Sequence, residues 1–303
     1  MTGERERVRH ALGRVGVWTF ALDGSTAGTE REAVAEIEAM GFPALWVPEG
    51  LGSKEVLSHL ALLLGASERL TVCSGIANIW ARDSVAAANG ARTLAGAYPG
   101  RLVLGLGVGH EYSTRVRGHE YRRVRKRMRE YLEMMDEARF NGTEPEEPAP
   151  RMLAALGDRM LELAAERTAG AHSYFVSIGH TERARRVLGR DPVLAVEQTA
   201  VLETDPERAR RIARSFTVHY LALPNYANNL RRLGFSEGDV AGEGSDRLID
   251  ATIAWGDAGA IVGRVKAHLE AGADHVCVQI VSEDDADVCL PQLRELAPAL
   301  LSL

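Results

Sequence analysis

Residues 83–110, DSVAAANGARTLAGAYPGRLVLGLGVGH, hold one complete helix–strand unit and show how the rest of the chain is organised. Asp83 can cap a helix that runs to Ala97, and Gly100 can supply the left-handed conformation that ends helices. The apolar run 101–106 is typical of a parallel strand that is buried on both faces. The stretch therefore predicts a helix, a tight exit and a strand that enters a sheet.

The same unit recurs along the chain. Apolar runs predict eight strands, at Val15–Phe20, Ala44–Pro48, Leu70–Gly75, Arg101–Leu106, Met152–Ala155, His172–Val176, Val193–Val201 and His275–Val281. Helix starts are predicted by a capping box of Thr29 and Glu32 and by Asp205 followed by Pro206. Glycines that stand before strands predict helix ends, at Gly41, Gly100, Gly170 and Gly272.

Eight strand–helix units in 303 residues predict an α/β fold, a (β/α)8 TIM barrel, since such barrels take about 250 residues. A doubly wound open sheet is the alternative. The late eighth strand, followed by one closing helix at Asp287–Leu301, favours the barrel. No linker divides the chain, so we expect a single domain over residues 1–303 with a loop insertion at about residues 219–246, near the C-terminal mouth.

The composition excludes several classes of protein. A hydrophobic content of 46% is ordinary for a soluble globular protein, and a net charge of −6 argues against nucleic-acid binding. The longest apolar run, 60–64, is far shorter than the about 20 residues that span a bilayer, and residues 1–9 resemble no signal peptide. The three cysteines lack metal-ligand spacing. We therefore expect a cytoplasmic protein with no membrane partner, no nucleic-acid partner and no metal.

Candidate functional residues follow the predicted strands, because barrel enzymes carry their sites at strand C-termini. Glu49 follows the second strand and is either a catalytic carboxylate or a solvated loop residue. His110 follows the fourth strand and is an acid, a base, a hydrogen-bond donor or a structural histidine. Trp80 lies beyond the third strand and forms a pocket wall or plugs the barrel top.

Three further patterns bear on the binding of anions or on the close approach of the backbone to a ligand. Alternating glycines in 105–109 allow backbone to approach a ligand, but their spacing and the basic segment that follows exclude a Rossmann site. A helix that starts at Asp158 or Arg159 offers backbone N–H groups to a phosphate. The run Tyr121–Arg129, YRRVRKRMR, fits a solvated and internally paired helix better than a site for an acidic ligand.

Five blocks together resemble the luciferase-like monooxygenase superfamily, and they are closest to its actinobacterial branch of probable F420-dependent oxidoreductases. The blocks are LWVPE, LTVCSGIANIWARD, YPGRLVLGLGVGH, MREYLEMMD and LAALGDRMLELAAERTAGAH. The resemblance extends from about Gly16 to Leu300. It implies a barrel that holds a flavin or deazaflavin at its C-terminal mouth. It also implies a non-proline cis peptide at Gly75–Ile76, in a bulge behind the ring.

The same resemblance implies roles for individual residues. Cofactor contacts would come from Gly75, Ile76, Asn78, Gly107, Val108, Gly109, Ala155, Leu156 and Gly157, the last three at the phosphate. Glu49 would sit near the pyrimidine side of the ring. The substrate pocket would include Trp18, Phe20 and Trp80. The chain departs from the branch at His110, where some relatives carry an acid, and at Asp158, where proline is usual.

The resulting expectation is an F420-dependent oxidoreductase that transfers a hydride between the cofactor and a small organic substrate. His110 or Glu49 would move the accompanying proton. Three alternatives stay open: an FMN- and O2-dependent monooxygenase, a non-catalytic flavin-binding barrel, and a phosphate-handling barrel enzyme without flavin. The resemblance also implies a homodimer.

Overall fold

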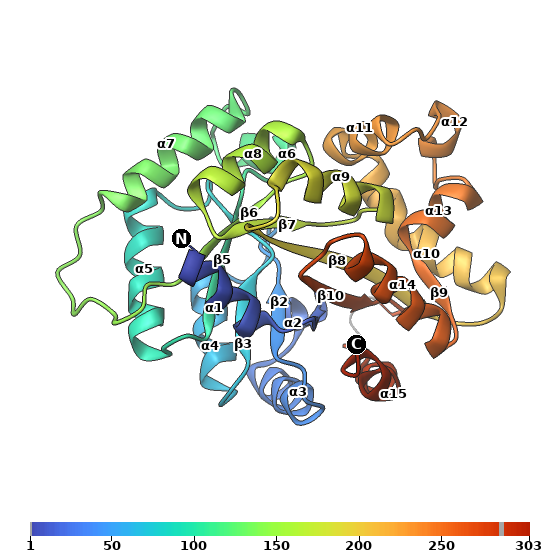
Figure 1. The fold of residues 1–303 in the computed structure, drawn as a ribbon, viewed down its shortest axis with the longest axis horizontal. Coiled ribbons are helices and arrows are strands. Elements are labelled where there is room, and N and C mark those ends of the chain that lie inside the picture. Colours follow the sequence, from blue (N-terminus) through green and yellow to red (C-terminus); the bar gives the residue numbers. More distant parts are fainter. Residues whose placement is uncertain (1, 285–287) are drawn as a thin grey trace.

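The computed structural model describes residues 2–284 and 288–303, and its centre is a closed barrel of parallel strands (Figure 1). The eight barrel strands are β1 Val15–Trp18, β2 Ala44–Val47, β3 Thr71–Ser74, β5 Leu102–Gly107, β6 Arg151–Ala154, β7 Gly170–Ser173, β8 Val193–Leu202 and β10 His275–Ile280. The ring closes because β10 pairs in parallel with both β8 and β1, in registers that include His275↔Ala195 and Val15↔Val276. The closure confirms the predicted barrel and excludes the open sheet.

Each of the eight predicted strands is present to within a few residues. Two further strands were not predicted. β4, Ala77–Asn78, pairs with β5, and β9, Ala254–Gly256, pairs with the end of β8. Both are too short to show a hydrophobic period in the sequence.

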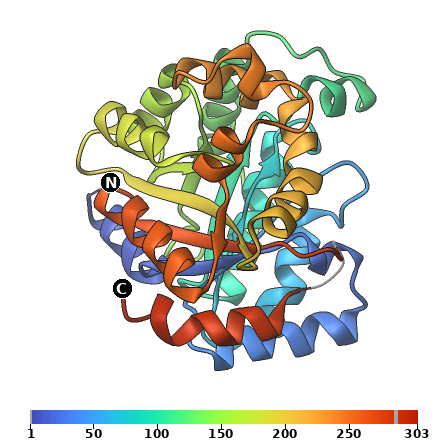
Figure 2. The same cartoon turned by 90° about the vertical axis from the view of Figure 1, so that its right-hand side faces the viewer.

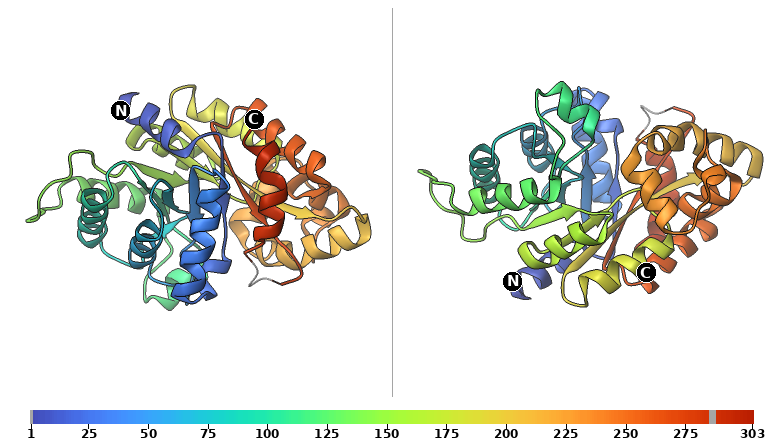
Figure 3. Two further views of the ribbon diagram at one scale, coloured as in Figure 1. Left: turned by 90° about the horizontal axis from the view of Figure 1, so that it is seen from below. Right: turned by 90° about the horizontal axis from the view of Figure 1, so that it is seen from above.

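One helix of the outer ring follows each barrel strand (Figure 2, Figure 3). These helices are α3 Ala27–Ala39, α4 Val56–Gly65, α5 Ser84–Ala97, α7 Val124–Asp136, α8 Asp158–Arg167, α9 Ile178–Leu188, α14 Ala258–Glu270 and α15 Leu290–Leu300. The helical ring closes where α15 contacts α14 on one side and α3 on the other. The predicted closing helix is thus confirmed over Leu290–Leu300, while its predicted start, Asp287, lies outside the described residues. Among the described residues, none of the helices combines the length and apolar content needed to cross a bilayer.

Most predicted helix boundaries are confirmed. Asp83 caps α5 by accepting from the N–H of Ala86, and Asp205 caps α10, Pro206–Leu221. The boundary of α3 differs, because Thr26 caps it and accepts from the N–H of Thr29 at 3.2 Å, so the capping box at Thr29 was wrong.

The four predicted exit glycines divide into two groups. Gly41, Gly100 and Gly272 have φ values of 96°, 72° and 106°, as helix ends require. Gly170 instead begins β7, where a Cβ would lie 1.9 Å from the carbonyl oxygen of Val193. Its small size serves strand packing rather than a helix end.

The barrel interior is filled by side chains from the strands and from α1, Thr2–Leu12. Val8 and Leu12 of α1 belong to the same buried cluster as Trp46. Cys73 and Cys277 also belong to it, and burial raises the pKa of both thiols, so the prediction of core cysteines is confirmed.

Four short helices lie at the mouth. One of them, α6 Glu111–Val116, follows β5. The other three lie between β8 and α14 and are α11 Pro224–Arg232, α12 Glu237–Val240 and α13 Asp246–Thr252. A further short helix, α2 Ala21–Gly24, follows β1. The segment 219–246, expected to be an irregular loop, is thus largely helical and packs around Phe175, Leu221 and Leu230 (Figure 1). Its status as an insertion in a single domain stays a prediction.

Candidate functional site

A cavity of about 610 Å³ opens at the C-terminal ends of the barrel strands. Its size is typical of small-molecule and cofactor sites, which measure about 300–1,000 Å³. It brings together twelve predicted site residues: Trp18, Phe20, Glu49, Gly75, Ile76, Asn78, Val108, Gly109, His110, Ala155, Leu156 and Gly157. The two other predicted residues, Gly107 and Trp80, do not line it.

One wall of the cavity is a bulge between β3 and β4. The Gly75–Ile76 peptide bond is cis, which confirms the geometry that the resemblance implied. The chain then returns to the barrel, where Asn78 pairs with Gly107 of β5. Gly75, Ile76 and Asn78 all face the cavity. The bulge therefore presents backbone and one aliphatic side chain as a surface for a flat ligand.

The glycines of β5 make room for this bulge. A Cβ on Gly105 would lie 2.0 Å from the carbonyl oxygen of Ser74, and a Cβ on Gly107 would lie 2.4 Å from Cδ1 of Ile76. Real Cβ atoms do not approach so closely. Gly107 thus contacts the back of the bulge and is not among the residues that line the cavity, and its expected contact with the cofactor stays a prediction.

Trp80 closes the outer side of the bulge. It is 8% exposed, and its Nε1 donates to the carbonyl oxygen of Val108 at 2.9 Å. The ring of His119 packs 5.5 Å away, centroid to centroid. Of the two interpretations of Trp80, the structure favours the plug over the pocket wall.

Glu49 is held in place by Arg82 and the bulge. Both guanidinium Nη atoms of Arg82 donate to its carboxylate, one of them to Oε2 at 2.9 Å. The N–H of Asn78 donates to the same oxygen at 2.7 Å. The two charged side chains are 4% and 9% exposed. These contacts occupy the carboxylate and fit a positioning residue for the bulge better than a group that moves a proton.

His110 lies at the edge of the cavity, at the start of α6. Its Nδ1 lies 3.1 Å from Oδ1 of Asn225, which belongs to α11. Burial lowers the pKa of His110 below its ordinary value, and the hydrogen bond to Asn225 opposes this only in part. The ring is therefore neutral at pH 7. When Nδ1 donates to Asn225, Nε2 carries the lone pair and can accept a proton.

Three buried side-chain nitrogens of the cavity wall lack partners. Trp18 Nε1 and both ring nitrogens of His172 make no hydrogen bond among the described residues. His172 stacks on Trp46 with a centroid distance of 4.4 Å, and burial lowers its pKa to about 3. A nitrogen of the neutral imidazole and the indole N–H thus face the bulge without a hydrogen-bond partner. Buried polar groups rarely lack a hydrogen bond, and a polar ring bound in the cavity could supply one.

A further wall of the cavity is aromatic and was largely missed in the sequence. The hydroxyl of Tyr174 lies 2.9 Å from that of Tyr220 and donates to Gln279 Oε1 at 2.8 Å. Tyr226 packs against both rings, and burial raises the pKa of Tyr174 and Tyr226. Both phenols are therefore protonated near neutral pH. Tyr174 directly follows β7 but was predicted to lie inside a strand that runs to Val176, and Tyr226 lies on α11, which showed no pattern.

The far end of the cavity is the start of α8. Gly157 precedes the helix without a side-chain cap, and the first turn of a helix leaves N–H groups without intrahelical partners. Asp158 does not fill this space, because Arg183 binds its carboxylate through hydrogen bonds of 2.9 and 2.7 Å. Arg183 also lowers the pKa of Asp158. The helix start can therefore accept a phosphate despite the acidic residue.

Together these walls form a site for a flat, polar ring with an anionic end. The bulge offers a surface for such a ring, Trp18 and His172 offer unpartnered nitrogens, and the start of α8 offers N–H groups to an anion. His110 stands beside this space as a proton acceptor. Within residues 2–284 and 288–303, no group of three or more histidine, cysteine or acidic side chains is arranged to hold a metal.

Comparisons with known proteins agree with the barrel fold. The 5,10-methylenetetrahydromethanopterin reductase of Methanolobus tindarius is 23% identical over 284 residues, which cover 86% of this chain and 83% of that protein. An F420-dependent secondary alcohol dehydrogenase, solved with an F420–acetone adduct, superposes with a TM-score of 0.75 at 17% identity, covering 95% of this chain and 98% of that one.

A third comparison brings in a flavin enzyme. The oxygenating constituent of 3,6-diketocamphane monooxygenase from Pseudomonas putida, in complex with FMN, has a TM-score of 0.70 at 13% identity, covering 94% of this chain and 95% of that one. At such identities the solved structures establish the fold alone. The sequence profile of the luciferase-like monooxygenases matches residues 13–275, most of the chain. The chain therefore belongs to the luciferase-like monooxygenase family.

Proposed function

We propose that the protein is an F420-dependent oxidoreductase that transfers a hydride between the deazaflavin and a small organic substrate. The observation that carries the proposal is the mouth cavity, with its cis bulge on one side and an uncapped helix start at its end. The names of its relatives support the choice of cofactor, since one similar structure is an F420-dependent alcohol dehydrogenase and another an F420-dependent tetrahydromethanopterin reductase.

The residues of the cavity fit this cofactor. Gly75 and Ile76 would support the ring, with Asn78, Val108 and Gly109 beside it. Ala155, Leu156 and Gly157 would hold the phosphate at the start of α8. When bound, F420 supplies two-electron hydride chemistry at a ring carbon. Trp18 and Phe20 lie on the aromatic side and would contact the substrate.

The chain's own contribution to the chemistry is proton transfer and exclusion of water. His110 is neutral and can take the proton that an alcohol releases when its carbon loses a hydride. Asn225 orients the imidazole through Nδ1. The aromatic side chains of Tyr174, Tyr220 and Tyr226 narrow the space above the ring and limit access of water. Glu49 acts through the bulge, as a positioning residue.

An FMN-dependent monooxygenase is the second candidate, because an FMN-bound structure shares the fold. Fluorescence titration of the purified protein with F420 and with FMN separates the two. We expect saturable binding of F420 and turnover of alcohol or carbonyl substrates. Tight binding of FMN without binding of F420 would overturn the proposal. Cofactor binding without any turnover, unchanged in His110→Ala, would indicate a non-catalytic barrel.

We further propose a cytoplasmic homodimer. The support for the dimer is the family resemblance, which implies one. Light scattering of the purified protein tests the dimer, and a monomeric mass at micromolar concentration would contradict it.

A further inference from the structure

A second, smaller cavity of about 260 Å³ adjoins the mouth cavity. Its walls come from the end of β1, from α10 and from β10 with the residues that follow it. Phe20 and Tyr220 line both cavities and therefore form the boundary between them. We call this smaller cavity the side pocket. Since small-molecule sites usually measure about 300–1,000 Å³, its size fits a branch of the mouth cavity better than a separate site.

The two boundary side chains are held differently. The ring of Tyr220 packs against those of Phe216 and Phe175, at centroid distances of 4.9 and 5.0 Å. Phe20 is exposed, and its ring contacts that of Trp18 edge-on at 4.4 Å. Exposed side chains change rotamer within nanoseconds. Tyr220 is therefore a fixed wall, whereas Phe20 can turn toward solvent and join the two cavities.

The interior of the side pocket is apolar. Its carbon surface comes from Phe20, Ala21, Phe216, Tyr220, Ile280 and Val281. Two hydroxyls in its walls are already engaged, since Thr19 Oγ1 accepts from the N–H of Ala21 at 3.1 Å and Ser215 Oγ donates to the carbonyl oxygen of Ile212 at 2.7 Å. An apolar cavity of about 150 Å³ can hold a benzene molecule. The side pocket therefore has room for one ring with a small substituent.

Gln279 adds one polar group to these walls. It is 3% exposed, and it lines the side pocket but not the mouth cavity. Its Oε1 accepts from the hydroxyl of Tyr174 at 2.8 Å, whereas its Nε2 makes no hydrogen bond within the described part of the chain. The oxygen and nitrogen of a carboxamide point in different directions, so the N–H groups are left for a ligand. Buried donors rarely lack a partner, which indicates that an acceptor binds here.

The side pocket offers nothing inside it to balance a charge. Apart from the phenol of Tyr220, the ionisable side chains that line it are His219 and Asp284, and both are exposed to water. An ionised group taken into the apolar interior would lose its hydration without gaining a buried partner. An anion would also meet the carboxylate of Asp284. The walls therefore select a neutral ligand.

We propose that the side pocket binds the far end of the substrate, a neutral ring-sized apolar group that carries a hydrogen-bond acceptor such as a carbonyl oxygen. The proposal rests on the proposed function, because the reacting carbon of the same molecule would lie in the mouth cavity. Phe216 and Tyr220 contact the ring, and Gln279 Nε2 donates to the acceptor. Phe20 covers the passage between the two ends of the molecule.

The test compares four alcohols that share one reacting end: 2-butanol, 4-phenyl-2-butanol, and its para-acetyl and para-carboxylate derivatives. The kcat/KM of each is measured with F420. The phenyl compound should exceed 2-butanol by about ten- to 150-fold, the range for burying a phenyl group. The neutral acetyl group should add about two- to tenfold through its hydrogen bond. The carboxylate should lower kcat/KM below that of the phenyl compound.

Ser215→Phe fills the side pocket from α10 without touching the mouth cavity. The ratio of kcat/KM between the acetyl compound and 2-butanol should fall to near one in this variant. Thr93→Phe in α5 is the matched control, since it also replaces an exposed hydroxyl that donates to a carbonyl of its own helix. The control should keep the wild-type ratio. A wild-type ratio near one, a ratio that survives in Ser215→Phe, or a preference for the carboxylate would overturn the proposal.

A crystal soaked with 4-bromoacetophenone, without any cofactor, separates this proposal from the proposed function. The anomalous signal of bromine locates the ring. Bromine beside Phe216, with the carbonyl oxygen at Gln279 Nε2, would support the side pocket even if no alcohol is turned over, a result that would refute the proposed function alone. Turnover of alcohols together with bromine in the mouth cavity only, or with no bound bromine, would overturn the side pocket and leave the proposed function in place.

Discussion

Gly107→Ala tests whether the glycines of β5 exist to accommodate the bulge. The added Cβ would lie 2.4 Å from both Cγ1 and Cδ1 of Ile76 and 3.3 Å from Cβ of Ala154. Favourable carbon–carbon contacts need about 3.5–4.0 Å, so Ile76 must move toward the cavity by roughly an ångström. Overpacking of this kind costs about 1–3 kcal/mol of stability. Because Ile76 lines the cavity, we also expect cofactor affinity to fall about tenfold, or roughly 1.4 kcal/mol.

Urea denaturation measures the stability, and fluorescence titration measures cofactor binding. Gly96→Ala in α5 is the matched control, since no heavy atom lies within 4 Å of its added Cβ and alanine favours the helix by up to about 1 kcal/mol. Ile76→Ala should restore the stability of Gly107→Ala, because it removes both colliding atoms. The two changes should therefore couple by about 1–3 kcal/mol in a double-mutant cycle. Wild-type stability and cofactor binding in Gly107→Ala would refute this explanation of the motif.

Three further perturbations test the site and the core. Arg82→Met should destabilise the fold by about 3–5 kcal/mol in urea, because it leaves the buried carboxylate of Glu49 without its partner; an unchanged midpoint would contradict this. His110→Ala should lower kcat about 10²–10⁴-fold and remove the acid limb of the pH–rate profile, which lies below pH 6.5 because burial lowers the pKa of His110. Burial lowers the pKa of four histidines to about 3 or 4, at His172, His180, His268 and His275. The free energy of unfolding should therefore fall as pH drops below 6.5, by up to about 1.4 kcal/mol per pH unit for each of them, because the unfolded chain binds protons that the folded chain does not bind. Urea midpoints at pH 7, 6 and 5 check this, and a midpoint that does not change with pH would contradict it.

The barrel could be predicted because its information is local. A strand buried on both faces needs a continuous apolar run, and residues 102–106 show one whatever their neighbours are. Helix starts such as Asp83 depend on contacts three residues away. The wrong predictions concern residues whose role depends on distant parts of the chain. Gly170 stands where a helix should end, but its size is dictated by Val193, which comes from another strand.

The position of the site could be predicted from the sequence, but the role of each residue in it could not. Glu49 follows a strand, as a catalytic carboxylate would, but Arg82 lies 33 positions further along the chain and occupies both of its oxygens. His172 was predicted only as the start of a strand, although its ring faces the bulge without a partner. Strand ends show where side chains gather, whereas pairing decides which of them stay free to act.

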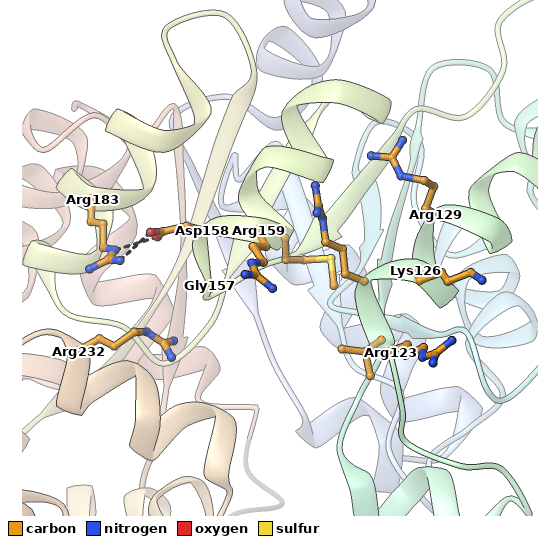
Figure 4. A pocket seen from close by; sticks show the side chains of 11 residues that line it. Arg123, Lys126, Arg129, Gly157, Asp158, Arg159, Arg183 and Arg232 are labelled. Atoms are coloured by element: carbon orange, nitrogen blue, oxygen red, sulfur yellow. Dashed lines mark hydrogen bonds and ion pairs between the residues drawn. The ribbon is translucent and has the colours of Figure 1, made fainter.

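The glycine and arginine patterns both depend on contacts with other elements. Gly107 was expected to approach a ligand, and the structure adds that the bulge after β3 constrains it. The run 121–129 was expected to pair within its own helix; Lys126 does pair with Glu130, but Arg125 and Arg129 pair with acids of α8. Those acids are thereby engaged by α7, and Arg159, in the first turn of α8, has no ion-pair partner among the described residues (Figure 4). A count of charges along α7 alone therefore underestimates the surplus of positive charge beside the mouth cavity, because the pairing is decided between helices.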